Sequence, residues 1–113
     1  MGVDALRQRY GQLQEYSAIF SATQASLAIA TSSDGNVRIV VAKFILSTKG
    51  KGFSRFQSGG TGIGPELHVA TYGGIALDEP DIAASYGAAL NWSSDIAATH
   101  SIFIKYYLQG YGS

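Results

Sequence analysis

The stretch that decides the fold is Val37-Arg-Ile-Val-Val-Ala-Lys-Phe-Ile-Leu46, which follows the turn sequence Ser32-Ser-Asp-Gly-Asn36. A run rich in β-branched residues predicts a strand, and Asp34-Gly35 predicts a tight turn before it, because glycine accepts positive φ. Upstream, Ala25–Ile29 alternates larger apolar side chains with small or polar ones, as a half-buried strand does. We therefore expect a β-hairpin over residues 25–46.

Both faces of the second strand of this hairpin are largely apolar. Strict alternation places Val37, Ile39, Val41, Lys43 and Ile45 on one face and Arg38, Val40, Ala42, Phe44 and Leu46 on the other. A strand of this kind must be covered on two sides. The pattern predicts that a helix of the same chain, a second copy or another partner covers the outer face, and we expect self-association.

The rest of the chain predicts more short strands joined by tight turns. We expect strands at Phe53–Gln57, Glu66–Tyr72, Ile75–Leu77, Tyr86–Trp92 and His100–Gln109, and a glycine-rich loop at Ser58–Pro65. Two helical segments are expected, a short N-terminal helix from Asp4 to about Tyr16 and a turn or two from Asp78 through Ala84. Six to eight such strands predict a single antiparallel β-barrel or sandwich with a short N-terminal helix, as one domain over residues 1–113.

The composition and charge of the chain exclude several kinds of functional site and partner. The 113 residues include no cysteine, which excludes disulfides and thiolate metal sites. Lys+Arg and Asp+Glu number 8 each, but residues 1–57 carry a net +4 (7 basic, 3 acidic) and residues 58–113 a net −4 (1 basic, 5 acidic). A nucleic-acid-binding domain usually has a strong basic excess, so we expect no nucleic-acid partner. Lys49, Lys51 and Arg55 either form a basic patch that meets an anionic surface or are solvated charges that the acidic second half neutralises across the surface.

The N-terminus shows no charged segment followed by an apolar one, and no apolar run approaches ~18 residues. We therefore expect a soluble chain with neither a signal peptide nor a transmembrane segment in this sequence. The pattern leaves the native compartment open.

Catalytic motifs are weak. Gly60-Thr-Gly-Ile-Gly64 lacks the spacing of a dinucleotide or phosphate loop, and Gly52-Phe-Ser-Arg-Phe56 lacks the final glycine of a nucleophile elbow. His68, His100 and a carboxylate such as Glu66 could hold a metal ion if the fold brought them together, although no local ligand spacing supports this. We predict no cofactor, no metal and no catalytic residue, with a small hydrolase or metal-dependent enzyme using His68, His100 and a carboxylate as the alternative.

The aromatic side chains of the second half either fill the core beside small residues or form a stacking surface for a partner. Taking the second possibility together with the basic patch, we predict a non-catalytic binding module that acts at a protein or membrane surface. The predicted binding residues are Lys49, Lys51, Arg55, Tyr72, Trp92 and Tyr106.

Over about residues 52–110, the order of several segments resembles the virulence-associated proteins of intracellular actinobacteria. The segments are Gly60–Gly64, Ala70-Thr-Tyr-Gly-Gly74, the acidic Asp78–Ile82 before Tyr86, and Ala98-Thr-His100 leading into Ile102–Tyr107. The resemblance implies a compact eight-stranded antiparallel barrel with glycine-rich faces and no recognised active site, secreted and acting on host phagocytic compartments. This sequence departs from the family in showing neither a secretion signal nor the family's long N-terminal stretch, so the resemblance leaves location and virulence role open.

Overall fold

Eight strands make up the fold of the computed structural model, which describes residues 13–32 and 34–110. Their bounds are β1 (Gln14–Phe20), β2 (Gln24–Ala30), β3 (Val37–Thr48), β4 (Gly52–Ser58), β5 (Thr61–Val69), β6 (Gly74–Asp78), β7 (Leu90–Ser94) and β8 (His100–Gly110). No helix occurs among the described residues. The expected N-terminal helix lies largely outside them, and the last part of its range, Gln14–Tyr16, belongs to β1 instead.

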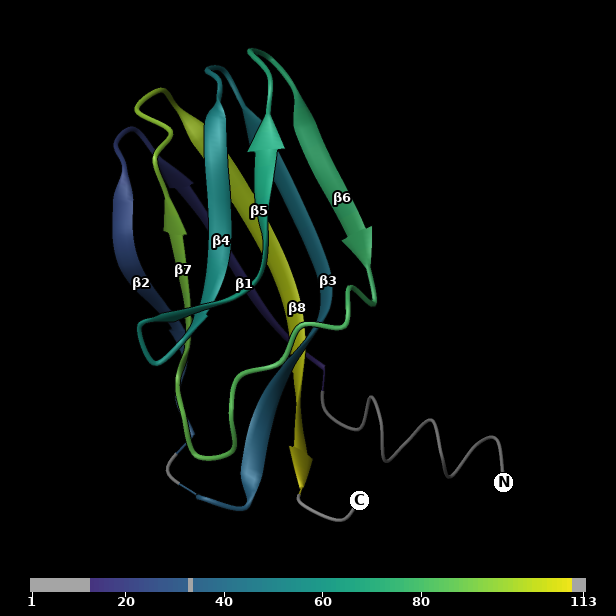
Figure 1. The fold of residues 1–113 in the computed structure, drawn as a ribbon. Helices are drawn as coiled ribbons and strands as arrows, with labels where there is room; N and C mark the ends of the chain where they lie inside the picture. The colour runs from purple at the N-terminus through teal and green to yellow at the C-terminus, as the bar shows by residue number, and fades with distance from the viewer. Residues whose placement is uncertain (1–12, 33, 111–113) are drawn as a thin grey trace.

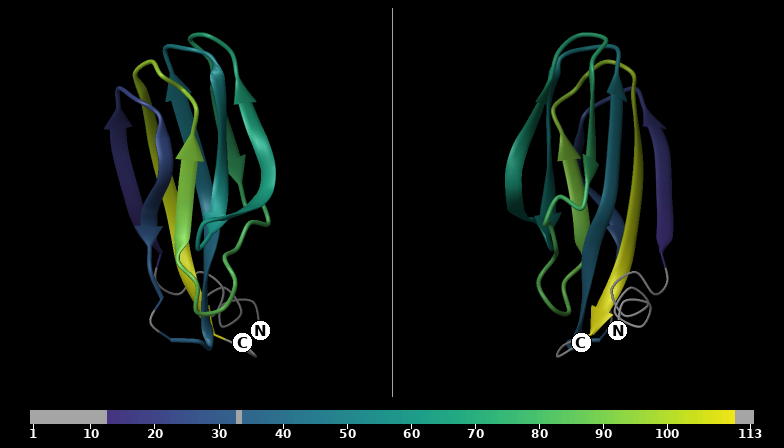
Figure 2. Two further views of the ribbon diagram at one scale, coloured as in Figure 1. Left: turned by 60° about the vertical axis from the view of Figure 1, so that its left-hand side comes forward. Right: turned by 90° about the vertical axis from the view of Figure 1, so that its right-hand side faces the viewer.

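The strands form two four-stranded antiparallel sheets, sheet A in the order β1-β8-β3-β6 and sheet B in the order β2-β7-β4-β5. The two sheets lie face to face as layers (Figures 1 and 2). This order is that of a jelly roll, in which most consecutive strands alternate between the two sheets. The prediction of an antiparallel β-barrel or sandwich is confirmed in its sandwich form, with two separate sheets in place of the closed barrel that the family resemblance implies.

The expected hairpin over residues 25–46 is wrong in its pairing. Both strands and the turn exist, and the turn is closed by hydrogen bonds from Val37 N to Asp34 O (3.0 Å) and from Asn36 N to Asp34 Oδ1 (2.8 Å). However, β2 pairs with β7 in sheet B, whereas β3 pairs with β6 and β8 in sheet A. The turn therefore carries the chain from one layer to the other. Among consecutive strands of the described residues, only β4 and β5 pair with each other.

The apolar character of both faces of β3 is explained by a β-bulge. The register with β8 shifts between Val41 and Lys43, so Ala42 is the extra residue. Before the bulge Ile39 and Val41 point inward, and after it Phe44 and Leu46 do. Large apolar residues from both predicted faces are thus collected on one side, and the need for an external cover that we inferred from alternation largely disappears.

The helix expected from Asp78 through Ala84 is also wrong. After β6 the chain follows the lower half of β3 without forming a helix, with hydrogen bonds from Glu79 N to Ala42 O, from Val41 N to Ile82 O, and from Ala84 N to Ile39 O (2.8–3.0 Å). Glu79 and Asp81 adopt positive φ (50° and 60°), which lets the segment follow the bulged strand. Pairing with an available strand edge therefore overrides the local helix-start signal.

The core lies between the two sheets along their whole length. Its largest fully buried side chains are those of Trp92, Phe44, Phe56, Ile39, Leu46, Leu90, Ile96 and Ile104. Phe44 and Phe56 reach across from opposite sheets and meet edge to face, with ring centroids 5.1 Å apart.

Candidate functional site

Four turns meet at the end of the sandwich at which β1, β3, β5 and β7 end (Figure 1). They connect β1 to β2, β3 to β4, β5 to β6 and β7 to β8. Backbone hydrogen bonds from Thr48 N to Gly73 O (3.1 Å) and from Lys49 N to Thr99 O (2.9 Å) join three of them. Gly50 permits the close approach, because a Cβ there would lie 2.5 Å from the Cβ of Ala98. Residues distant in sequence thus share one surface.

This surface surrounds a shallow hollow of about 330 Å³. We call its rim the tip surface, and it consists of Ile19, Ser47, Lys49, Tyr72, Thr99 and Ser101, with Thr48 and His100 beneath. Ile19 is 77% exposed and Tyr72 is 81% exposed, the two most exposed large hydrophobic side chains among the described residues. Tyr72 stands at the tip of the β5–β6 turn with φ of 57°.

Two of the predicted binding residues, Lys49 and Tyr72, therefore lie together, and Lys51 is exposed on the same β3–β4 turn as Lys49. Neither lysine forms an ion pair with a residue in the described ranges. Ile19 was not singled out from the sequence. Its place on this surface follows from the pairing of β1 with β8, which sets Ile19 opposite Ser101, and no local sequence signal reports that pairing.

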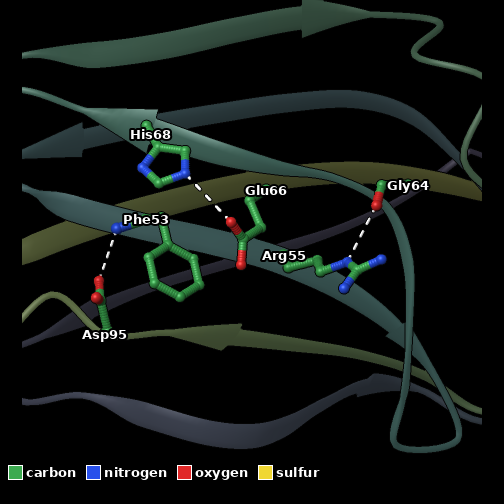
Figure 3. A network of polar contacts seen from close by, with 6 residues as sticks. All are labelled: Phe53, Arg55, Gly64, Glu66, His68 and Asp95. Carbon is green, nitrogen blue, oxygen red and sulfur yellow. Dashed lines mark hydrogen bonds and ion pairs between the residues drawn. The ribbon is translucent and has the colours of Figure 1, made fainter.

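Arg55 belongs to a different surface, the outer face of β4 and β5 (Figure 3). It lies four residues further along the chain than Lys51, about 13 Å in an extended strand, so the three basic residues do not form one patch. Its Nε donates to Gly64 O (3.0 Å), and its guanidinium covers Gly62, where a Cβ would lie 2.7 Å from Arg55 Cζ. Arg55 thereby fastens the β4–β5 connection.

The same outer face carries a small polar network (Figure 3). His68 Nε2 lies 3.3 Å from Glu66 Oε1, and the His68 ring lies 5.3 Å from the Phe53 ring at a tilt of 36°. Phe53 N donates to Asp95 Oδ1 (2.6 Å). Glu66, His68 and Asp95 therefore all have partners within the chain.

Trp92 and Tyr106 are buried in the core, which corrects their prediction as binding residues. Trp92 is fully buried and packs on Phe20, with ring centroids 5.8 Å apart. Tyr106 is 9% exposed and its hydroxyl donates to Gln14 Oε1 (3.1 Å). Both residues alternate inward along their strands, so the aromatic-rich second half fills the core here.

The two histidines do not converge. His68 is exposed on the outer face of sheet B, whereas His100 is 1% exposed and lies between the sheets. His100 Nδ1 donates to Ala98 O (2.8 Å), since a carbonyl only accepts, so Nε2 accepts from Ser94 Oγ at 3.0 Å. Within residues 13–32 and 34–110, no group of three or more His, Asp or Glu side chains could hold a metal ion. Ser94 and His100 resemble the serine and histidine of a catalytic triad, but both are buried. The position of the triad's carboxylate is taken by the backbone carbonyl of Ala98.

A second hollow of about 380 Å³ lies at the other end of sheet A, between the lower half of β3 and the segment after β6. Arg38 lines it, donating from Nε to Gln109 Oε1 (2.7 Å), with its guanidinium carbon 5.3 Å from the centre of the Tyr86 ring. Asp81 and Tyr107 also line it. Sequence reasoning did not find this hollow, because Arg38 and Gln109 are 71 residues apart and meet only through the β3–β8 pairing.

No family model matches the chain, and no curated protein matches it. Among solved structures, it is similar to a chain from a study reporting that Bacillus endospore appendages form a novel family of disulfide-linked pili. That similarity has a TM-score of 0.46 at 14% identity and covers 84% of this chain and 86% of the other. At this level the likeness has no bearing on function. Among the described residues, no helix has the length and apolar character needed to cross a membrane.

Proposed function

We propose that this chain is a non-catalytic binding module whose tip surface binds an acidic face of a protein partner. The observation that carries the proposal is the grouping of Lys49 with the exposed Tyr72 and Ile19 around one hollow. Exposed apolar side chains gathered beside polar groups are typical of interaction sites, and tyrosine is enriched in them.

The charges and hydroxyl groups of this end favour a protein over a lipid surface. Lys49 and Lys51 supply positive charge, and the carboxylate of Asp95, which lies close to Gly52 at the end of the same turn, accepts a hydrogen bond from Phe53 N. Ser47, Thr99 and Ser101 line the hollow with hydroxyl groups that can bond to peptide and carboxylate groups. Insertion into lipid requires a broader apolar area than Ile19 and Tyr72 provide.

The proposal of a non-catalytic role rests on the geometry of the candidate nucleophile. In the described part of the chain, the only serine hydrogen-bonded to a histidine is Ser94, and it is 6% exposed. A substrate cannot reach this hydroxyl without separating the sheets, which favours a structural role for the pair.

Capture from a lysate of the source organism tests the proposal. The immobilised full chain is compared with the variant Lys49→Gln/Lys51→Gln/Tyr72→Ser, and Lys43→Gln serves as a control that removes a charge from the outer face of sheet A. We expect the triple variant to lose captured proteins several-fold and to keep its melting temperature, because exposed side chains contribute little to stability. The control should capture as the wild type does.

Cosedimentation with vesicles of phosphatidylserine and phosphatidylcholine tests whether the tip surface binds a membrane instead of a protein. Cosedimentation that depends on Lys49, Lys51 and Tyr72, without any captured protein that depends on them, would replace the protein partner by a membrane. Equal capture by the wild type and the triple variant would show that the tip surface is not the site.

A further inference from the structure

The four outer strands of the sandwich differ in how open their free edges are. An outer strand presents unpaired backbone N–H and C=O groups, and proteins usually protect such an edge with charges, proline, bulges or short length. Sheet A ends in β1 and β6, and sheet B ends in β2 and β5. Three of these four edges carry a protection, and β1 does not.

The protections are specific to each strand. In β5, Pro65 has no N–H to donate, Gly64 adopts φ of 69°, and the register with β4 shifts beside them. In β2, the register shifts twice within seven residues. The strand β6 is only five residues long.

The strand β1 keeps an unbroken register with β8 over all seven of its residues, from Gln14 opposite Tyr106 to Phe20 opposite His100. It contains no proline, glycine or basic residue, and its one charge, Glu15, faces Lys105 across the pair (3.8 Å). It lies at the margin of the molecule in both views of Figure 2. Among the described residues, no strand other than β8 pairs with β1. A regular edge of this kind is open to one more strand.

The sequence of β1 is complementary to itself in the antiparallel sense. When two copies pair about Ser17, Tyr16 of each lies opposite Ala18 of the other, and Glu15 lies opposite Ile19. A bulky side chain therefore faces a small one, and the two Glu15 carboxylates are not opposed, which would be unfavourable.

We propose that β1 pairs with β1 of a second copy, antiparallel and centred on Ser17, to form a two-fold symmetric dimer. The two A sheets become one continuous sheet of eight strands, counting four from each copy. Tyr16, Ala18 and Phe20 pack on the core but remain only partly buried in one copy, and the second copy covers them. Such a two-fold contact uses the same patch on both copies and closes on itself.

The dimer adds a property to the binding module. Antiparallel pairing turns one copy by half a circle in the plane of the sheet, so the two tip surfaces point in opposite directions. A dimer can therefore hold two partners at its two ends. The proposal does not depend on the tip surface binding anything, because it rests on β1 alone.

Charge variants at the centre of the pairing test it by sedimentation of the full chain. Ser17→Lys sets two lysines opposite each other, and we expect the dimer fraction at micromolar concentration to fall several-fold. Ser17→Glu should do the same, whereas an equimolar mixture of the two variants should recover the dimer. Ala76→Lys is the matched control, since Ala76 occupies the same row of sheet A, through Ile45 and Phe103, at the opposite edge.

A single introduced cysteine tests the register. Because the chain has no cysteine, the cysteine introduced by Ser17→Cys can form a disulfide only with the same cysteine of a second copy. Residues opposite each other in an antiparallel pair have Cα atoms within the range that a disulfide spans. We expect Ser17→Cys to form a linked dimer on mild oxidation several-fold faster than Ala76→Cys. A wild type that stays monomeric, a Ser17→Lys variant that dimerises as the wild type does, or equal linkage of both cysteine variants would overturn the proposal.

Discussion

The strands β1 and β5 are outer strands of the two different sheets of the sandwich, and their free edges are of opposite kinds. The strand β5 is irregular, with Gly64 at φ of 69° followed by Pro65, and its exposed Glu66 and His68 pair with each other. The strand β1 is regular and carries one charge, which is neutralised within its own sheet. Each strand has one paired neighbour, β8 for β1 and β4 for β5. The difference shows that the free side of an outer strand, and not its pairing, decides whether it can accept another chain.

The largest effect is expected from the same substitution made at both edges. Gly64→Val should lower the free energy of unfolding by about 2 kcal/mol, because a β-branched residue is strained at positive φ. Its Cβ would also press on Ile82, 3.3 Å away. Ser17→Val should change it by less than about 0.5 kcal/mol, because valine suits an extended, exposed position. Urea unfolding measures both, and an equal loss would mean that the two edges do not differ in backbone strain.

A somewhat smaller loss of unfolding free energy is expected from a substitution at the side of the sandwich formed by β1 and β2. There Ser94, opposite Gln24 of β2, bonds to His100, opposite Phe20 of β1, and so ties sheet B to sheet A. Ser94→Ala leaves the His100 ring nitrogen buried without a donor and should cost about 1–2 kcal/mol.

The control for this tie is the neighbouring Ser93, on the outward side of β7. Ser93→Ala loses only a 3.3 Å bond to Arg55 O and should cost less than about 0.5 kcal/mol. If unfolding shows the same loss for both serines, the buried bond does not hold the layers together.

Local sequence signals found the strands more reliably than their partners. The ranges around β2, β3, β4, β6 and β8 were predicted closely, because alternation and turn residues act within a few positions. The hairpin failed because Asp34-Gly35 specifies a turn and not which strand lies beside which. The bulge at Ala42 and the irregular segment from Glu79 to Ala84 depend on hydrogen bonds with distant strands, which no local pattern reports.

The candidate site followed the same rule. Lys49 and Tyr72 lie together at the tip surface, but the sequence placed Tyr72 at the end of a strand and did not predict that the two residues are neighbours. Trp92 and Tyr106 were wrongly predicted as binding residues, because the sequence pattern of an aromatic side chain is the same whether it faces the core or a partner. Ile19 and the open β1 edge were missed, since an edge is a property of the sheet order and not of the strand alone.

Removing the protection of β5 should make it resemble β1. Pro65→Thr restores a backbone donor and Glu66→Thr removes a charge, so the double variant exposes a second edge that can pair. We expect light scattering to show association beyond the dimer at concentrations at which the wild type does not exceed it. The bulge at Gly64 remains and should keep the increase modest. Unchanged mass would assign the protection of this edge to Gly64 alone.

The smallest effect is expected at Glu15, and it reports the register of β1. The pair of Glu15 with Lys105 is solvent-exposed, with side chains 61% and 37% exposed, so Glu15→Gln should cost less than about 0.5 kcal/mol in unfolding. In pairing centred on Ser17, each Glu15 lies opposite Ile19 of the second copy, and the two Glu15 carboxylates are about 13 Å apart along the strand direction. Dimerisation measured by sedimentation should therefore be nearly the same for Glu15→Gln and the wild type, at low and at high salt. Pairing that strengthens several-fold in Glu15→Gln at low salt would mean that the two carboxylates oppose each other, and would move the centre of the dimer from Ser17 toward Glu15.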